Sequence, residues 1–212
     1  MAADGHQQPG RSAVTYRHAR LSDAAALVPY MERVFGESDF LSQDEGDPPL
    51  GEKQLKATIG DATGSTHQTL LLALDNETVI GLLRFRGGRT RRTRHTGEMG
   101  ITVRKSRWGQ GIASELLKHF FVWVAANGVI RQINLRVRPD NHRALSLYRR
   151  HGFAVTGRMC RELCINAQYH DHLIMGMSLE PPDPVLWHEE GMPASMHVNH
   201  TSHHIASFTY LA

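Results

Sequence analysis

Long apolar runs, a secretory leader and a strong charge excess are all missing from this chain of 212 residues. No apolar run approaches the ~20 residues that a membrane-spanning helix needs. The first residues, Met-Ala-Ala-Asp-Gly-His, lack the basic and then apolar layout of a secretory signal. A net charge of +3 is too small to indicate a nucleic-acid binder. We therefore expect a cytoplasmic protein that has neither a membrane nor a nucleic acid as its partner.

Cysteine is also scarce, because the chain contains only Cys160 and Cys164. Their spacing fits neither a zinc site nor a disulfide framework. We expect both to be small packed side chains in a reducing compartment. The rest of the composition, with 41% hydrophobic and 21% charged residues, suits one globular domain with a good core.

The chain divides into three parts by composition. Residues 1–12 are polar and predict a flexible N-terminal arm, residues 13–180 carry the periodic patterns of a single domain, and residues 181–212 predict a loosely ordered extension. The extension contains four closely spaced histidines without a rigid scaffold, so we predict no metal site there. These histidines are His197, His200, His203 and His204.

Within the domain, strand patterns and helix patterns follow one another in a mixed order. Alternating residues predict strands over 13–19, 70–74, 79–85, 98–103, 133–137, 153–156 and 172–179. Helical spacing predicts helices after a cap at Ser22, over 54–59, from 112 onward and from 142 to a stop at Gly152. Pro29 should kink the first helix or delay its start. This order predicts an α/β or α+β fold around one sheet.

One segment has the features of a phosphate-binding turn. Residues 103–114, Val-Arg-Lys-Ser-Arg-Trp-Gly-Gln-Gly-Ile-Ala-Ser, end a strand, turn through two glycines and begin a long helix. Glycines allow backbone amides to converge, and a helix N-terminus adds about half a positive charge. Taken alone, the segment is equally typical of a tight strand-to-helix turn.

A second segment makes the pattern specific. Residues 141–153 read Asn-His-Arg-Ala-Leu-Ser-Leu-Tyr-Arg-Arg-His-Gly-Phe. With both segments in this order, the chain resembles the GNAT superfamily of acetyl-CoA-dependent N-acetyltransferases over roughly residues 14–180. The first segment is similar to the family motif Q/R-x-x-G-x-G/A, with Trp108 at the Q/R position. The second is similar to N-x-x-A-x-x-L-Y-x-x-x-G-F.

The resemblance implies a GNAT-like single domain with a mixed, mostly antiparallel central sheet flanked by helices. A splayed strand pair would form the cleft for acetyl-CoA, the co-substrate, and no metal would be needed. Backbone groups of Ile101 and Val103 would bind the pantetheine arm as an added strand does. The remaining cofactor-binding residues implied are Trp108, Gly109, Gln110, Gly111, Ile112, Ala113, Ser114, Asn141, Ala144 and Tyr148.

Two side chains are candidates for proton transfer. Amine acylation expels a thiolate, and Tyr148 matches the family tyrosine proposed to protonate it; as an alternative, it is simply a packed helix residue. Glu98 is the candidate base, directly or through water, with His95 or water alone as the alternatives. Because side chains alternate along a strand, we expect a bulge near Gly97 or Gly100 to decide where Glu98 points.

Three further features have both a simple and a functional interpretation. The arginines between 84 and 94 indicate a solvated sheet edge rather than a nucleic-acid site. The acidic loop over 36–51 is either solvated or borders the acceptor site, where it would attract a cationic amine. Tyr169 and Asp171 precede the last strand and are candidates for the substrate side.

The function predicted from these features is transfer of an acetyl group to a primary amine of a small molecule or protein N-terminus. The amine would attack acetyl-CoA directly in a ternary complex, since neither cysteine lies in a nucleophile motif. The alternative is a CoA- or acyl-CoA-binding regulatory module without turnover. A homodimer is compatible with either function.

Overall fold

The computed structural model describes residues 13–43 and 46–179 and contains one seven-stranded sheet in the order β1-β2-β3-β4-β5-β7-β6. Neighbouring strands are antiparallel except for the parallel pair β4–β5. This mixed, mostly antiparallel sheet confirms the predicted fold class. The strands are β1 (Val14–His18), β2 (Gln68–Asp75), β3 (Thr78–Gly87), β4 (Thr96–Val103), β5 (Gln132–Val137), β6 (Ala154–Ile165) and β7 (Gln168–Ser178).

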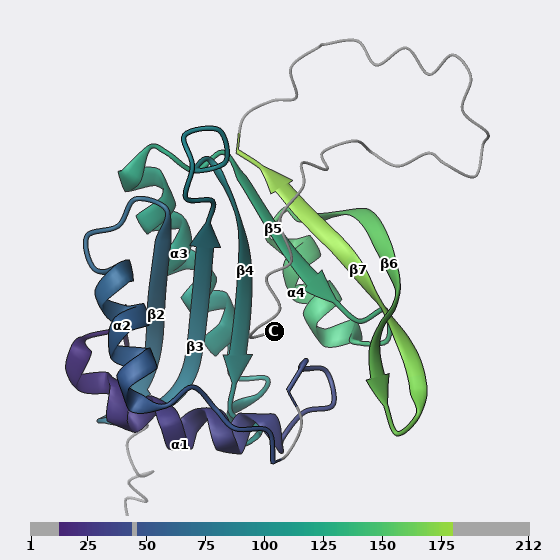
Figure 1. Ribbon diagram of the computed structural model, residues 1–212, viewed down its shortest axis with the longest axis horizontal. Helices are drawn as coiled ribbons and strands as arrows, with labels where there is room; N and C mark the ends of the chain where they lie inside the picture. The colour runs from purple at the N-terminus through teal and green to yellow at the C-terminus, as the bar shows by residue number, and fades with distance from the viewer. Residues whose placement is uncertain (1–12, 44–45, 180–212) are drawn as a thin grey trace, which may run out of the picture.

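Four helices cover the two faces of the sheet. The helices α1 and α2 lie on one face, and α3 and α4 lie on the other (Figure 1). They span Ala24–Phe35 (α1), Glu52–Ala62 (α2), Ile112–Asn127 (α3) and His142–Arg150 (α4). The strand β2 is buried on both faces, with Leu70 and Leu72 in the core under α1 and α2 and Leu71 in the core under α3. This explains its uninterrupted apolar sequence.

The helix α3 forms as the apolar stripe predicts. Ile112, Leu116, Phe120 and Val124 are all buried against the sheet. The helix begins after Gly111 and ends before a second glycine, and both glycines have left-handed backbone conformations. Such conformations are readily adopted only by glycine, so the two glycines fix where this helix starts and stops.

The feature that positions the site is the separation of β4 from β5. The two strands pair only from Thr96↔Gln132 to Glu98↔Asn134. Beyond that point β4 remains bonded to β3, up to Gly81↔Val103, while β5 remains bonded to β7, up to Val137↔Leu173. The strands therefore diverge, as Figure 1 shows below the label β5. This confirms the predicted splayed pair.

The start of α1 differs from the prediction. Asp23, not Ser22, organises the turn before the helix: its carboxylate accepts from the backbone N–H of Arg20 at 2.7 Å and from both guanidinium nitrogens of Arg17. Ser22 is exposed. The helix begins before Pro29 and continues to Phe35, so the proline does not delay its start.

The end of the domain also differs from the prediction. The strands β6 and β7 form a hairpin much longer than expected, from Ala154↔Gly176 to Ile165↔Gln168. Cys160 and Cys164 lie on this hairpin and are exposed, so their predicted packing is wrong. The strand β6 is the last in the sheet and has no buried residue, so side chains on both of its faces remain accessible, including those of the two cysteines. The expected arm, the C-terminal extension and its histidines lie outside the described residues.

No helix in the described part of the chain has the length and apolar content needed to cross a membrane.

We predict that Asp23→Asn destabilises the protein by about 1–3 kcal/mol at neutral pH, because it breaks a charge-assisted pair with Arg17. The Arg17 guanidinium holds the pKa of Asp23 below its usual value. The stabilisation is therefore complete above the unfolded-state pKa of about 3.9 and is lost as the pH falls through the lower folded-state pKa.

Urea unfolding of both proteins between pH 7 and pH 3 measures this difference. It should shrink on acidification, and a difference that is constant across the range contradicts the assignment.

Candidate active site

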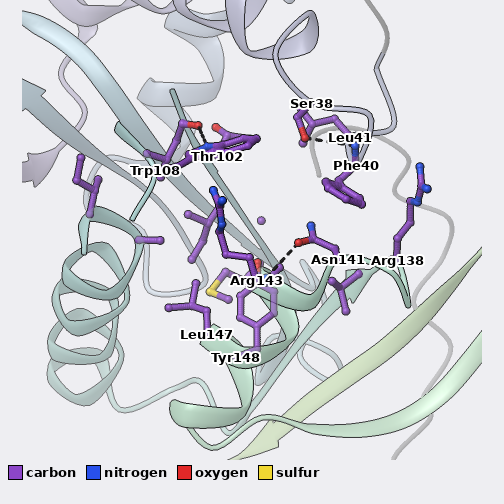
Figure 2. Close-up of a pocket in the computed structure, with 18 of the residues that line it drawn as sticks. Ser38, Phe40, Leu41, Thr102, Trp108, Arg138, Asn141, Arg143, Leu147 and Tyr148 are labelled. Atoms are coloured by element: carbon purple, nitrogen blue, oxygen red, sulfur yellow. Dashed lines mark hydrogen bonds between the residues drawn. The ribbon is translucent and has the colours of Figure 1, made fainter. Parts of the chain in front are cut away.

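A cavity of ≈ 680 Å³ lies where β4 and β5 separate. Its walls come from β3, β4, β5, the N-terminus of α3, one side of α4 and the loop that follows α1. The side chains labelled in Figure 2 include members of β4, α4 and this loop. Elements far apart in the sequence therefore surround one space. The sequence-predicted residues that line it are Glu98, Ile101, Val103, Trp108, Gly109, Gly111, Ile112, Ala113, Ser114, Asn141, Ala144 and Tyr148.

The backbone of β4 turns alternate peptide groups toward the cleft. The N–H of Arg104 donates to Ile80 on β3 at 3.0 Å, and antiparallel pairing makes every second residue face β3 in the same way. Ile101 and Val103 therefore direct their peptide groups away from β3. The indole of Trp108 donates to the Val103 carbonyl at 2.7 Å, so Val103 offers the cleft its N–H group.

The N-terminus of α3 presents backbone donors to the cavity. The first helical bond runs from Glu115 N–H to the Gly111 carbonyl, so the N–H groups of Ile112, Ala113 and Ser114 have no acceptor within the helix. A Cβ placed on Gly111 would meet nothing within 4 Å. Open space in front of converging N–H groups suits a pyrophosphate.

Gln110 is placed differently from its neighbours. Its side chain is exposed and donates to the Ser106 carbonyl at 3.2 Å, and it does not line the cavity. The predicted phosphate cradle is therefore built from backbone and small residues rather than from this amide.

Asn141 caps α4 and also lines the cavity. Its side-chain oxygen accepts from the Ala144 N–H at 3.1 Å and caps α4. Because the oxygen is used for the cap, the amide NH₂ group is what the side chain offers to the cavity it lines.

Tyr148 reaches the cavity from α4. Its side chain is 7% exposed and its ring packs edge-on against Phe153. Burial raises the pKa of Tyr148 to about 12. The phenol therefore keeps its proton at neutral pH and remains a hydrogen-bond donor.

Glu98 reaches the cavity from the other face of the sheet. It lies on the same side of β4 as Thr102, which the hydroxyl of Tyr30 on α1 contacts at 2.9 Å. The β3–β4 register runs without a shift from Gly81↔Val103 to Gly87↔Gly97. The expected bulge is therefore absent from this pair, and the regular alternation of the strand alone directs Glu98.

The environment of Glu98 favours a base. Burial raises the pKa of Glu98, its ion pair with Arg136 at 3.4 Å opposes the rise, and nearby Glu162 adds to it. A carboxylate with a raised pKa is a better proton acceptor. His95 lies before β4, is exposed and does not line the cavity.

The arginine interpretation was wrong for Arg84 and Arg86. They belong to β3, which lies between β2 and β4 and is no edge, and both line the cavity. Arg136 on β5 and Arg138, the residue directly after β5, also line it and were not considered. The signal for Arg84 and Arg86 was in the sequence: they are spaced by two residues, which places both on one face of a strand.

Tyr169 and Asp171 lie on the β6–β7 hairpin and do not contribute to this arrangement. Tyr169 is 65% exposed on the β6–β7 hairpin, and Asp171 pairs with Arg158 on the same hairpin. Neither residue lines the cavity.

The loop after α1 closes one side of the cavity, and the labelled Ser38, Phe40 and Leu41 project toward it in Figure 2. Arg138 holds this loop: its guanidinium donates to the Asp39 carbonyl at 2.7 Å and lies 5.1 Å from the centre of the Phe40 ring. The acidic loop does border the cavity, but its Glu37 is paired with Arg104.

Metal ligands do not gather in this part of the molecule. Over residues 13–43 and 46–179 there is no group of three or more His, Cys, Asp or Glu side chains that could hold an ion.

Comparison with known families agrees with this geometry. The model of the Acetyltransferase (GNAT) family matches residues 34–153, which include the two motif segments at 103–114 and 141–153. The chain therefore belongs to the GNAT acetyltransferase family. It is an acetyl-CoA-dependent N-acetyltransferase.

Two curated relatives come from Escherichia coli. The chain is 24% identical to an L-amino acid N-acetyltransferase over 165 residues, 77% of this chain and 97% of the relative. It is 26% identical to a ribosomal-protein-serine acetyltransferase over 102 residues, 48% of this chain and 56% of the relative. The match thus spans about half the length of the second relative.

Solved structures share the fold. A GNAT acetyltransferase from Streptococcus pneumoniae is 31% identical, with a TM-score of 0.76 over 79% of this chain and 100% of its own. An acetyltransferase from Salmonella typhimurium, solved with acetyl-CoA, is 20% identical, with a TM-score of 0.69 over 81% of this chain and 99% of its own.

We predict that Gly111→Ala weakens acetyl-CoA binding by about tenfold or more, because the methyl group enters the space before the α3 N–H groups. Isothermal titration with acetyl-CoA measures the loss. Both Gly111 and Gly128 have left-handed backbones, at φ 82 and φ 64, and open space at Cβ.

Gly128→Ala is therefore a matched control. It introduces the same strain, about 1–2 kcal/mol, at the opposite end of α3 without touching the cradle. Equal acetyl-CoA affinity in the two variants would place the pyrophosphate elsewhere.

Proposed function

We propose that this enzyme acetylates a primary amine, of a small molecule or a protein N-terminus, by direct attack in a ternary complex. Glu98 is the general base and Tyr148 donates a proton to the departing thiolate. The observation that carries the proposal is their position: both line the cavity that also contains the α3 cradle, and they reach it from opposite faces of the sheet.

The cofactor half of the cavity uses mainly backbone groups. The α3 N–H groups hold the pyrophosphate, and the outward peptide groups of Ile101 pair with the pantetheine arm as a neighbouring strand would. Acetyl-CoA supplies the acyl group as a thioester. The N–H of Val103 is available to polarise the thioester carbonyl, as an oxyanion donor does.

Glu98 prepares the acceptor. An amine attacks only in its neutral form, and a carboxylate with a raised pKa removes the proton directly or through one water. The ion pair with Arg136 opposes the rise in the pKa of Glu98 and fixes the direction of the carboxylate. Water alone is the remaining alternative, since His95 is outside the cavity.

Tyr148 assists the leaving group. A thiol with a reference pKa near 8.5 leaves as a thiolate, which a nearby phenol stabilises by donating its proton into a hydrogen bond. Burial keeps the phenol protonated throughout the working range, because the pKa of Tyr148 is about 12.

The position of the cysteines supports direct attack. A covalent acyl-enzyme would need a nucleophile next to the thioester. Cys160 and Cys164 are both exposed on β6 and neither lines the cavity. The proposed steps therefore involve no acylated cysteine.

We predict that Tyr148→Phe lowers turnover by roughly 10–10³-fold while acetyl-CoA affinity stays nearly constant, because only the hydroxyl is lost. Thiol release at saturating acetyl-CoA gives the rate, and titration gives the affinity. The factor should not vary between pH 6 and 10, since Tyr148 does not titrate there.

Tyr16→Phe is the control, because Tyr16 stacks on His119 away from the cavity. A fully active Tyr148→Phe enzyme would mean that the tyrosine serves packing alone.

We predict that Glu98→Gln slows the reaction most at low pH, where the amine is mostly protonated, and that the loss shrinks as rising pH frees the amine. The measurement is the rate at saturating acetyl-CoA from about pH 6 to 10, which brackets amine and thiol titration. A variant rate that equals the wild-type rate throughout would leave water as the base.

Glu162→Gln supplies a sharper control. Glu162 pairs with the same Arg136 at 2.7 Å but does not line the cavity, and its charge raises the pKa of Glu98. Removing that charge should lower the pKa of Glu98 and shift the acid limb of the rate profile to lower pH. If the acid limb moves to higher pH or stays fixed, a group other than Glu98 is responsible for it.

A further inference from the structure

A stacked pair of side chains lies in the same cavity as the α3 cradle. Arg143 of α4 and Trp108 both line this cavity, together with Gly111 and Ala113. The guanidinium carbon of Arg143 lies 4.4 Å from the centre of the Trp108 ring, and Figure 2 shows the arginine extending from α4 toward the indole. A cation from α4 and a ring from the loop before α3 therefore meet beside the cradle.

The ring of Trp108 is held in place independently of the arginine. Its indole N–H donates to the Val103 carbonyl at 2.7 Å, which fixes the plane of the ring. An aromatic face attracts a guanidinium placed over it. Because Arg143 rests on a fixed ring, it loses less conformational freedom when it binds a ligand than a free arginine would.

Arg143 differs from its neighbours in lacking a carboxylate partner. Three of the other arginines that line the cavity form ion pairs, Arg107 with Asp75, Arg136 with Glu162 and Arg138 with Asp140. Within residues 13–43 and 46–179, no Asp or Glu side chain forms an ion pair with Arg143. Its charge is therefore available to a ligand.

The place of Arg143 in α4 is electrostatically unfavourable. The helix begins at His142, so Arg143 lies in the first turn, where the positive end of the helix dipole destabilises a cation. This turn contains no acidic residue that would offset the charge. Asp140, just before the helix, is already paired with Arg138. The guanidinium and the N-terminus of α4 thus give this wall of the cavity a positive potential, which suits an anion.

The cofactor has the groups that fit this charge. Acetyl-CoA carries a pyrophosphate and, on its ribose, a 3′-phosphate. Backbone N–H groups at a helix N-terminus supply only partial positive charge. A guanidinium adds a full charge and two parallel N–H donors that match the oxygens of a phosphate.

We propose that Arg143, held on the ring of Trp108, binds a phosphate group of acetyl-CoA, so that the enzyme selects the complete cofactor over donors without the nucleotide. Arg143 contacts the ligand, and Trp108 is a positioning residue that acts through it. This inference rests on the proposed function, because it assumes that the α3 cradle holds the pyrophosphate.

The test compares three donors by isothermal titration, which requires no acceptor. Acetyl-CoA carries both phosphate-containing groups, acetyl-dephospho-CoA lacks the 3′-phosphate, and S-acetylpantetheine lacks both. We expect Arg143→Gln to weaken acetyl-CoA binding by about tenfold or more and to leave S-acetylpantetheine binding unchanged. If the loss persists with acetyl-dephospho-CoA, Arg143 binds the pyrophosphate. If it disappears, Arg143 binds the 3′-phosphate.

Arg149→Gln is the matched control, because Arg149 is exposed on the same helix and does not line the cavity. This variant should bind all three donors as the wild type does. Arg143→Lys keeps the charge but not the planar fork, so its acetyl-CoA affinity should lie between those of the wild type and Arg143→Gln.

Two substitutions of Trp108 test its positioning role. Both Trp108→Phe and Trp108→Leu lose the indole N–H, but only the phenylalanine keeps an aromatic face under the guanidinium. Trp108→Phe should therefore retain more acetyl-CoA affinity than Trp108→Leu. In an Arg143→Gln background the two should bind acetyl-CoA equally, because the ring then has no guanidinium to position.

Thermal unfolding separates a binding role from a structural one. Without a ligand, Arg143→Gln should unfold close to the wild-type temperature, because the helix N-terminus disfavours this cation while the Trp108 ring favours it. With acetyl-CoA present, the unfolding temperature of the variant should rise less than that of the wild type, since stabilisation by a ligand follows its affinity.

Two results separate failure of this inference from failure of the proposed function. Arg143→Gln may be found to bind acetyl-CoA as tightly as the wild type, or to lose affinity for acetyl-CoA and S-acetylpantetheine alike; either result overturns the role of Arg143 and leaves the cradle intact. Equal wild-type affinity for all three donors would show that the cavity binds no phosphate, and the proposed cofactor site would itself be wrong.

Discussion

The site depends on a loss of pairing in the middle of the sheet. Up to Glu98 and Asn134, β4 and β5 share a parallel register, and beyond these residues each strand bonds only to its other neighbour. The peptide groups of Ile101 and Val103 thereby face a cavity instead of a strand, although buried peptide groups are normally paired. A ligand that completes this edge gains hydrogen bonds that the protein has left open, and the cavity exists because the strands diverge.

Because the strands diverge, both faces of β4 border the cavity. Odd-numbered residues of β4, such as Met99, pack on the α3 side, where helix N–H groups and Tyr148 gather. Even-numbered residues face α1 and carry Glu98 and Thr102. In the proposed mechanism, the cofactor and the activated acceptor therefore approach the reacting atoms from opposite faces, which keeps the proposed base and acid apart and avoids direct neutralisation of one by the other.

Charged contacts hold the mouth of this cavity in place. Glu37 accepts from the side chain of Arg104 and from the backbone N–H of Lys105, so it ties the loop after α1 to the end of β4. The guanidinium of Arg138 ties the same loop to the end of β5. The side chains of Arg104, Glu37 and Arg138 are only 18%, 21% and 7% exposed, so solvent screens their contacts less than it screens fully exposed ion pairs, and the contacts limit how far the two strand ends can separate.

Short-range sequence patterns by themselves predicted several local features of this protein. The Gly109–Gly111 turn, the Asn141 cap and the stripe of α3 follow from short-range rules, and the paired motifs identified the family. The tertiary structure decided the long-range questions: whether the strand that carries Arg84 is an edge, whether the two cysteines are covered, and which of Glu98 and His95 enters the cavity. These depend on strand order and register, and residues distant in sequence set both.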